Sequence, residues 1–211
     1  MTTTLYYIHD SMCSWCYGFA PTWNKIQEKL PSTITVEYVV GGLAPDSDQP
    51  MPEETKIMVR GAWERIQNML GTEFNFSFWD NNTPRRSTYP ACKAVLTAKM
   101  QNFEKEMIKA IQEAYYLRAL NPSDDDVLIQ IATELKNALP EQKIDIEKFS
   151  KDLNSDAINQ DLENQILLSR KLNHRGFPSL VLAHNNTPHF IEHDYKDHTI
   201  TLDKINALLN L

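Results

Sequence analysis

Residues 5–16 read LYYIHDSMCSWC. An apolar, aromatic run typical of a β-strand leads directly into two cysteines separated by two residues, Cys13 and Cys16. A strand that passes a dithiol to the first turn of a helix places one sulfur beside unpaired backbone N–H groups, which favour a thiolate. This stretch therefore predicts thiol–disulfide chemistry at the start of the chain.

The residues after Cys13 predict an amphipathic helix that treats the two cysteines differently. Apolar side chains recur at spacings of three and four and form one stripe, which consists of Cys16, Phe19, Trp23, Ile26 and Leu30. Cys13 lies one turn earlier and off this stripe. Residues three apart on a helix are close enough for a disulfide. We therefore expect Cys13 to be the nucleophile at the mouth and Cys16 to be the resolving cysteine.

The third cysteine does not favour a metal site. A structural zinc ion needs four ligands, and Cys92 is the only further cysteine, with no second C-x-x-C and no ligand pair of the usual spacing. Cys92 begins an apolar stripe of its own, which predicts a buried thiol, with a third redox role as the alternative.

Four histidines near the C-terminus also raise the question of a metal. His189 and His193 would share one face of a strand, and His184 and His198 lie near them in the sequence. The spacing along a strand exceeds easy chelation, and neither the ligand number nor the geometry is defined. We expect solvated or edge-strand histidines and no metal.

Composition limits the classes of function. The chain has 211 residues, 42% of them hydrophobic and 23% charged, which suits one globular domain or one domain carrying an insertion. Its net charge of -7 gives no electrostatic footprint for nucleic acid or an anionic membrane. No apolar run could span a bilayer, and residues 1–4 lead into the first strand without a signal peptide. We therefore expect a cytoplasmic protein.

Hydrophobic periodicity gives the order of the later elements. Residues 34–42 predict a second strand, and residues 45–52, rich in Pro, Asp and Ser, predict a loop. Helical stripes follow until residues 173–176. Their members are Val59, Trp63, Ile66 and Leu70; Cys92, Leu96 and Met100; Phe103, Met107, Ile111, Ala114 and Arg118; Leu128, Ile131, Leu135 and Leu139; Ile158, Leu162, Ile166 and Ser169.

The end of the chain returns to strands over 179–183 and 189–193 and closes with a helix over 202–209. The resulting order is strand, helix, strand, a helical block, strand, strand, helix. This is the layout of an α/β, thioredoxin-like fold with a helical insertion. We predict that residues 1–44 and 170–211 form the thioredoxin-like domain. Residues 45–169 would form the insertion, and its last helix would pack back on the core.

Three segments carry a resemblance to a known family. Residues 10–19 around the dithiol, residues 89–92 (Tyr-Pro-Ala-Cys) and residues 175–180 (Arg-Gly-Phe-Pro-Ser-Leu) resemble the DsbA-like thioredoxin superfamily. More narrowly, they resemble its leaderless, FrnE-like branch of predicted disulfide isomerases. The likeness spans nearly the whole chain. Ser11 is a small departure, because this branch often has proline there.

The resemblance implies roles for several residues. Phe177–Pro178 would be a cis peptide bond beside the dithiol, with the Phe177 backbone pairing with an extended substrate segment. We accordingly place Ser14, Trp15, Phe177 and Pro178 at the substrate-binding surface. The strand entered at Pro178 follows the long helix and would lie next to the first strand, which would bring this loop to Cys13.

Two readings stay open for other residues near the dithiol. Asp10 could relay a proton during resolution, or its carboxylate could cap the loop before Cys13. Aromatic residues could form an apolar rim around the thiols or belong to the core, and their exposure would decide between these; they are Trp15, Phe19, Trp23 and Phe177.

The leading functional hypothesis is ping-pong thiol–disulfide exchange of the reductase or isomerase type. The expected partners are protein or small-molecule disulfides, with glutathione as a co-substrate and no bound cofactor, nucleic acid or membrane. One alternative is a glutathione-dependent isomerase or transferase of the kappa or hydroxychromene carboxylate isomerase type, although those proteins generally have serine at the Cys13 position. A second alternative is a non-catalytic, peptide-binding adaptor.

Overall fold

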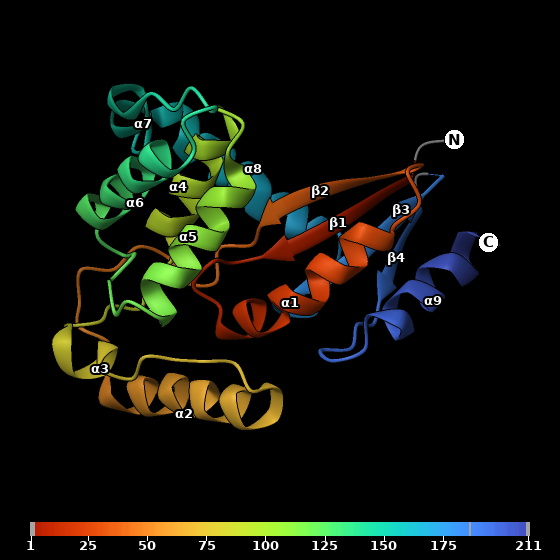
Figure 1. The fold of residues 1–211 in the computed structure, drawn as a ribbon, viewed down its shortest axis with the longest axis horizontal. Coiled ribbons are helices and arrows are strands. Elements are labelled where there is room, and N and C mark those ends of the chain that lie inside the picture. Colours follow the sequence, from red (N-terminus) through yellow and green to blue (C-terminus); the bar gives the residue numbers. More distant parts are fainter. Residues whose placement is uncertain (1–2, 186, 210–211) are drawn as a thin grey trace. The chain divides into compact units, whose positions relative to one another are not determined.

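The computed structural model describes residues 3–185 and 187–209. Its elements follow the predicted order, with strands at both ends of the sequence and helices between them (Figure 1). The strands are β1 (Thr3–His9), β2 (Ile34–Val40), β3 (Ser179–His184) and β4 (Thr187–Ile191). The helices are α1 (Ser14–Lys29), α2 (Glu53–Leu70), α3 (Phe78–Asn81), α4 (Tyr89–Lys99), α5 (Glu104–Tyr116), α6 (Asp125–Ala138), α7 (Ile146–Asp152), α8 (Asp156–Lys171) and α9 (His198–Leu209).

The chain divides into two compact units. Unit 1 consists of Met1–Gly41 and Gln165–Leu211, and unit 2 consists of Gly42–Asn164. The divisions predicted from the sequence, after residues 44 and 169, lie within a few residues of these. That the two parts are separate folding domains stays a prediction.

Unit 1 is built on a four-stranded sheet with the order β2-β1-β3-β4. β1 pairs with β2 in parallel and with β3 antiparallel, so its two neighbours come from opposite ends of the sequence. α1 and α9 contact each other on one face of the sheet, and the end of α8 packs on the other (Figure 1). This α/β arrangement confirms the predicted fold class and places the start of α1 at the carboxyl end of β1.

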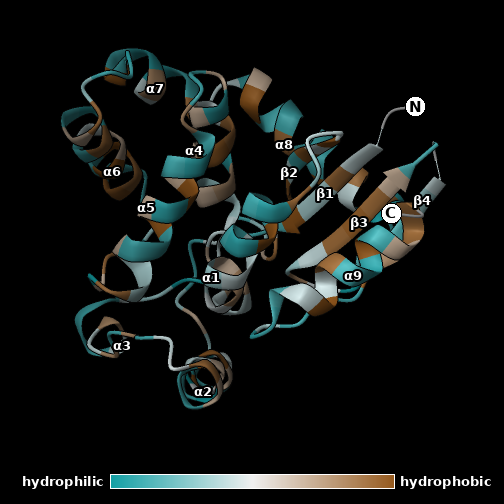
Figure 2. Ribbon diagram, turned by 45° about the vertical axis from the view of Figure 1, so that its right-hand side comes forward, coloured by the Kyte–Doolittle hydropathy of each residue, from teal (hydrophilic) through white to brown (hydrophobic). Residues whose placement is uncertain are grey.

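Side chains of β1 alternate between the two faces of the sheet. Tyr7 lies toward α1, where its ring stacks on Trp23 with centroids 4.5 Å apart. Ile8 lies on the other face and packs in a cluster with Val39, Val181, Leu168 and Leu172. Most residues of β3, a central strand, are hydrophobic (Figure 2), and its first four residues are buried. The sheet is therefore covered by apolar side chains on both faces.

α1 forms where the sequence predicts an amphipathic helix. Its stripe is buried as expected, because Cys16, Phe19 and Ile26 are fully buried and Trp23 is 3% exposed. Leu30, the last residue of the stripe, is the C-cap and is half-buried. Packing of this stripe fixes the position of the helix N-terminus beside the end of β1.

Unit 2 contains α2 to α7 and the first part of α8. The fully buried Trp63 of α2 lies at the centre of an aromatic cluster, in which its ring contacts Phe74, Phe76, Phe78, Trp79, Tyr115 and Tyr116. Asp125 and Asp126 occupy the first turn of α6, where the helix dipole favours negative charge. Unit 2 therefore has an aromatic core built from its own residues.

Some predicted positions are wrong in detail. Met100 follows the end of α4 and is 54% exposed, so it is not part of a buried stripe. β4 ends at Ile191, so His193 lies in the loop after the strand and does not share a strand face with His189. α3 and α7 are short helices that the periodicity did not predict.

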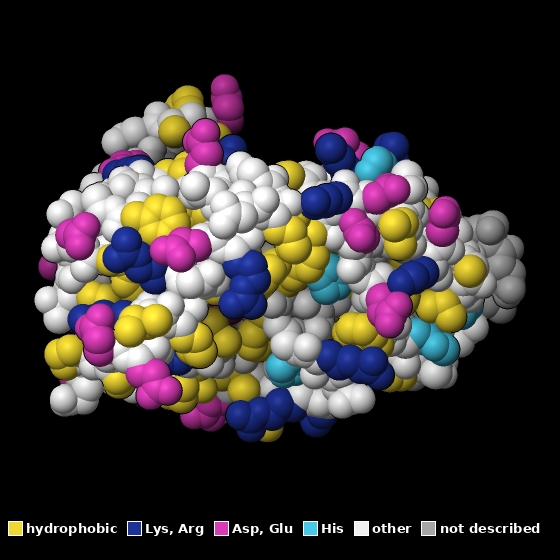
Figure 3. Space-filling model, turned by 90° about the horizontal axis from the view of Figure 1, so that it is seen from below, with side chains coloured by type: hydrophobic (Ala, Val, Ile, Leu, Met, Phe, Trp, Pro, Cys, Tyr) yellow, Lys and Arg dark blue, Asp and Glu magenta, His cyan; other side chains and the backbone are white. Residues whose placement is uncertain are grey.

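Charged side chains of both signs lie on the surface, as the composition of the sequence indicates. Figure 3 shows acidic and basic side chains interspersed on the face that it presents. Among residues 3–185 and 187–209, no helix is long and apolar enough to cross a membrane.

Candidate active site

Cys13 is the N-cap residue of α1, with φ -82° and ψ 115°. Its N–H donates a hydrogen bond to the Asp10 carbonyl at 3.0 Å, and its carbonyl accepts one from the Tyr17 N–H at 3.1 Å. No side chain caps the helix, so the first N–H groups of α1 are left for the sulfur to accept from. The thiols of Cys13 and Cys16 are both free.

The two sulfurs differ in their surroundings. Cys16 is fully buried, whereas Cys13 is 7% exposed. Cys13 is thus more buried than a residue at the mouth of the site was expected to be. The reason is the loop before β3, because the Cys13 thiol donates a hydrogen bond to the Phe177 carbonyl oxygen at 3.5 Å.

The pKa values of the two thiols move in opposite directions. The pKa of Cys13 lies below its ordinary value, chiefly because the Cys16 thiol donates a hydrogen bond to the Cys13 thiolate. Burial and the charge of Asp10 oppose this lowering, while the N–H groups of Cys16 and Trp15 support it. Burial raises the pKa of Cys16 well above its ordinary value. Of the two thiols, Cys13 therefore loses its proton first, and Cys16 keeps its proton to higher pH.

The loop over Cys13 has the geometry that the resemblance implies. The Phe177–Pro178 peptide bond is cis. Ser179 begins β3 and its hydroxyl donates to the Gly176 carbonyl at 2.7 Å, which fixes the loop to the strand. The Phe177 ring stacks on His174 with centroids 4.9 Å apart. β3 pairs directly with β1, so the sheet brings this loop to the start of α1.

A hollow of about 650 Å³ opens in unit 1 between Trp15 of α1 and the Phe177–Pro178 loop, the two segments that flank the dithiol, although neither Cys13 nor Cys16 lines it. Three of the predicted substrate-binding residues line it: Trp15, Phe177 and Pro178. Ser14 does not line it and is 8% exposed. Phe19 and Trp23 belong to the core, whereas Trp15 and Phe177 are half-buried at the hollow. The aromatic residues are thus divided between the two roles that the sequence left open.

Most of the hollow is lined by residues that the sequence analysis did not assign to substrate binding. They come from the loop before β3, from β4 and the loop after it, and from α9, and are Arg175, Gly176, Phe190, Glu192, His193, Asp194, Tyr195, Ile200 and Lys204. Only Arg175 and Gly176 belong to a segment that the resemblance covered. Sequence periodicity could not have found the others, because it carries no information about which strand end meets α9.

The loop after β4 is held against α1 by a hydrogen bond and a ring contact. The Thr22 hydroxyl donates to the Tyr195 carbonyl at 2.6 Å, and the Tyr195 ring meets Trp15 edge-to-face at 5.3 Å. Burial, together with the nearby charges of Cys16 and Cys13, raises the pKa of Tyr195. Tyr195 therefore stays protonated at neutral pH and offers a phenol close to the thiols.

The Asp10 carboxylate caps the loop before Cys13. That it relays a proton during resolution stays a prediction. Asp10 is fully buried, and its Oδ1 accepts a hydrogen bond from the Met12 N–H at 2.9 Å. Its charge raises the pKa of both Cys13 and Cys16. The carboxylate therefore acts on the dithiol electrostatically, whether or not it also accepts a proton.

The remaining candidates lie apart from the dithiol. Cys92 is 1% exposed on α4, as expected of a core thiol. Within residues 3–185 and 187–209, no group of three or more His, Cys, Asp or Glu side chains is placed to hold a metal ion.

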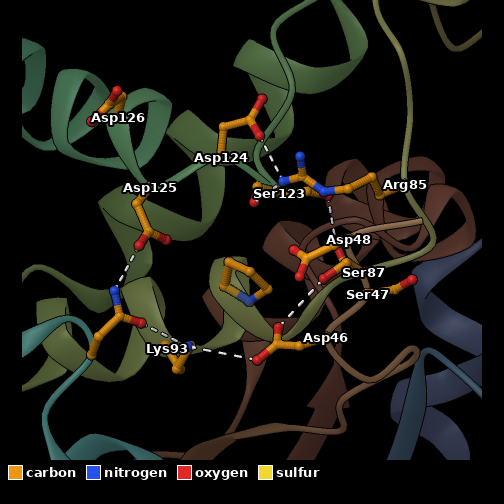
Figure 4. A pocket seen from close by; sticks show the side chains of 12 residues that line it. Asp46, Ser47, Asp48, Arg85, Ser87, Lys93, Ser123, Asp124, Asp125 and Asp126 are labelled. Carbon is orange, nitrogen blue, oxygen red and sulfur yellow. Dashed lines mark hydrogen bonds and ion pairs between the residues drawn. The ribbon is translucent and has the colours of Figure 1, made fainter. Parts of the chain in front are cut away.

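Unit 2 has a polar hollow of its own, of about 540 Å³ (Figure 4). Lys93 donates to Asn154 Oδ1 at 2.7 Å and lies 3.8 Å from Asp46, and Arg85 donates to Asp124 at 2.6 Å. Figure 4 shows these contacts joining the walls of the hollow. Its cations are thus paired within the hollow, and its lining includes neither cysteine nor histidine.

Comparison with known proteins agrees with the geometry of unit 1. The sequence profile of the family described as Thioredoxin matches residues 6–196. Among curated proteins, the chain is similar to the ClpXP adapter protein SpxH of Bacillus subtilis (strain 168), with 23% identity over 188 residues. That match covers 88% of this chain and 59% of the relative, so the chain spans about six tenths of the relative's length.

Solved structures show the same fold. One described as "a putative protein disulfide isomerase from Nitrosomonas europaea" superposes with a TM-score of 0.84 and 25% identity, covering 100% of this chain and 98% of the other. The cytosolic disulfide reductase DsbM from Pseudomonas aeruginosa has a TM-score of 0.78 and 21% identity, covering 99% and 100%. The family match and the Nitrosomonas europaea structure support thiol–disulfide oxidoreductase chemistry in general, and the structures of lower identity show the same fold.

Proposed function

This chain belongs to the thioredoxin family, and on that premise we propose that it is a thiol–disulfide oxidoreductase acting through Cys13 and Cys16. The observation that carries the proposal is the unequal dithiol. Cys13 is the N-cap residue of α1, and its thiol has a lowered pKa. Cys16 is fully buried one turn further along the helix. A low-pKa sulfur suits attack, and a protonated, buried neighbour suits the later step of resolution.

The proposed reaction is the reduction of a substrate disulfide in two exchanges. The Cys13 thiolate attacks one substrate sulfur, a Cys13–substrate disulfide forms, and the other substrate sulfur leaves as a thiolate. Cys16 then loses its proton and attacks Cys13 Sγ, which forms the Cys13–Cys16 disulfide and releases the second substrate sulfur. Two electrons pass from the protein to the substrate, whose two sulfurs take up two protons from solvent and Cys16.

We assign the hollow beside the dithiol to the substrate. Phe177 offers its backbone at 3.5 Å from Cys13 Sγ, where an extended segment carrying the disulfide would pair with it. Trp15 and Pro178 contribute apolar surface on either side. Ser14 does not line the hollow, so we assign it no contact with the substrate there.

The finer assignment is a reductase or isomerase that works in the cytoplasm with glutathione as co-substrate. Two glutathione molecules would reduce the Cys13–Cys16 disulfide and leave as oxidised glutathione, so no bound cofactor is needed. In support of this, a structure described as cytosolic disulfide reductase DsbM from Pseudomonas aeruginosa with GSH has the same fold, with a TM-score of 0.77. In isomerisation, a different substrate thiolate would instead attack the substrate sulfur that is bonded to Cys13, before Cys16 attacks. This forms a new substrate disulfide and releases Cys13 as a thiolate, with no net change in oxidation state.

A trapping experiment tests the proposal. The Cys16→Ser variant cannot resolve, so it should accumulate a mixed disulfide with glutathione when mixed with oxidised glutathione, detected by intact mass. Cys13→Ser should capture none, and Cys92→Ser, which alters a core thiol, should behave as the wild type does. The wild type should show a two-electron transition in glutathione redox buffers. Absence of both the adduct and the transition would refute the proposal.

A second candidate function is a non-catalytic adaptor that binds peptides in the same hollow. The observation in its favour is that the curated relatives are named ClpXP adapter proteins. The Cys13→Ser, Cys16→Ser double variant distinguishes the two functions. An adaptor would still bind peptides and keep its full cellular function in this variant. An oxidoreductase would lose its cellular function even if peptides still bind.

A further inference from the structure

The charged side chains of the hollow beside the dithiol are mostly satisfied by protein groups. Lys204 Nζ lies 2.8 Å from Glu192 Oε2, which makes an ion pair between α9 and the end of β4. Asp194 Oδ1 accepts two backbone N–H groups, those of Lys196 and Asp197, both at 2.7 Å. Burial lowers the pKa of His193, so its ring is uncharged at neutral pH.

Arg175 is the exception. It is exposed, and its guanidinium lies over the Phe190 ring, 4.6 Å from the ring centroid. Among the carboxylates of residues 3–185 and 187–209, none lies within 4.0 Å of this guanidinium. Glu192 is near enough for Arg175 to contribute to its lowered pKa, but its carboxylate is bonded to Lys204.

Hydrogen bonds fix Arg175 within the loop that covers Cys13. The Arg175 N–H donates to the Ser179 hydroxyl at 3.1 Å, and the same hydroxyl donates to the Gly176 carbonyl. Arg175 is two residues before Phe177, whose carbonyl accepts from the Cys13 thiol. A planar guanidinium stacked on an aromatic ring keeps its N–H groups free at the edge, where they suit a carboxylate.

We propose that Arg175 is a specificity-determining residue that favours disulfide substrates carrying a carboxylate close to the attacked sulfur. The inference rests on the proposed function, because it concerns the substrate of the same site. The proposal specifies the charge of the substrate near the attacked sulfur. Small dicarboxylate disulfides and peptides with an acidic residue beside the cysteine both meet this requirement.

Three small disulfides of different charge test the proposal directly. They are 3,3′-dithiodipropionate, which is anionic, 2-hydroxyethyl disulfide, which is neutral, and cystamine, which is cationic. We expect Arg175→Gln to lower kcat/KM for the anionic disulfide about three- to five-fold relative to the neutral one, as for an exposed charge pair. The cationic disulfide should be unchanged or faster. Added salt should remove the difference, because it screens exposed charges.

Arg170→Gln is the matched control. Arg170 is an exposed arginine on α8 that does not line the hollow, and its replacement changes the net charge by the same amount. It should leave the ratio of anionic to neutral rates unchanged. A second measurement avoids turnover altogether, because Cys13 alkylation by iodoacetate, an anion, should slow in Arg175→Gln relative to neutral iodoacetamide.

The outcomes separate the two proposals. If the wild type reduces none of the three disulfides, the oxidoreductase function fails. If the wild type is active but Arg175→Gln slows all three equally, or slows none, the specificity proposal is overturned and the function stands. An unchanged ratio of iodoacetate to iodoacetamide rates would also overturn the specificity proposal.

Discussion

Replacing Gly41 with alanine tests the packing that positions the loop over Cys13. The Gly41 N–H donates to the His9 carbonyl at 2.8 Å, which fixes residue 41 beside the end of β1. A methyl group there would overlap the Phe177 ring, because Cδ1 of that ring lies 2.9 Å from the ideal Cβ position and two further ring atoms lie closer. Phe177 must therefore move, and its carbonyl is the acceptor of the Cys13 thiol.

The expected magnitude follows from the exposure of the displaced ring. Overpacking a protein interior costs about 1–3 kcal/mol. Phe177 is half-buried, so its ring can turn toward solvent at the expense of its stacking on His174. We therefore expect the free energy of unfolding to fall by about 1–2 kcal/mol, the lower part of that range. Alkylation of Cys13 should become faster, because the loop that covers it is displaced.

Urea unfolding of the reduced protein and alkylation by iodoacetamide measure the two effects. Gly61→Ala is the control, since a methyl group there meets nothing within 4 Å. That change lies inside α2 and should stabilise by about 0.5–1 kcal/mol. In a Phe177→Ala background, the cost of Gly41→Ala should shrink by about 1 kcal/mol, because no ring remains to be displaced. A neutral Gly41→Ala, or a cost that persists without the ring, would refute this reasoning.

Further predictions concern the thiols and the core. In Cys16→Ala, the pKa of Cys13 should rise, because the thiol donor is lost. The inflection of the Cys13 alkylation rate against pH should then move up, and an unmoved inflection would contradict this. Asp10→Asn should lower the pKa of Cys13 and speed its alkylation at neutral pH, because the carboxylate charge raises that pKa; slower alkylation would count against it. Trp63→Ala should reduce the free energy of unfolding by about 3–5 kcal/mol. Ile57→Ala, at a site 66% exposed, should change it by less than about 0.5 kcal/mol, and similar losses at both would place Trp63 outside the core.

The features that could be predicted are those encoded locally. The α1 stripe from Cys16 to Ile26 is buried because a helix repeats its face every three to four residues, whatever it packs against. The unequal dithiol follows from the same periodicity, since Cys13 precedes the stripe and Cys16 belongs to it. The cis Phe177–Pro178 bond came from the family resemblance, because local sequence alone gives cis proline only a small probability.

The features that were missed depend on tertiary contacts. α3 (Phe78–Asn81) and α7 (Ile146–Asp152) are too short to show a period and depend on packing of their buried phenylalanines. The depth of Cys13 was missed because a backbone carbonyl covers it, and a carbonyl leaves no trace in the sequence. Arg175 was assigned no role from the sequence, because the role proposed for it depends on the stacking of its guanidinium on Phe190 of β4.

The hydrogen bond from Cys13 to Phe177 joins residues 164 positions apart in the chain. A ribosome therefore releases the dithiol, together with β1, α1 and β2, long before it releases the loop and the strand that cover the nucleophile. Until β3 inserts beside β1, the thiols of the nascent chain are open to any oxidant or partner nearby. Protection of Cys13 from a bulky alkylating reagent would thus mark the moment at which β3 has joined the sheet.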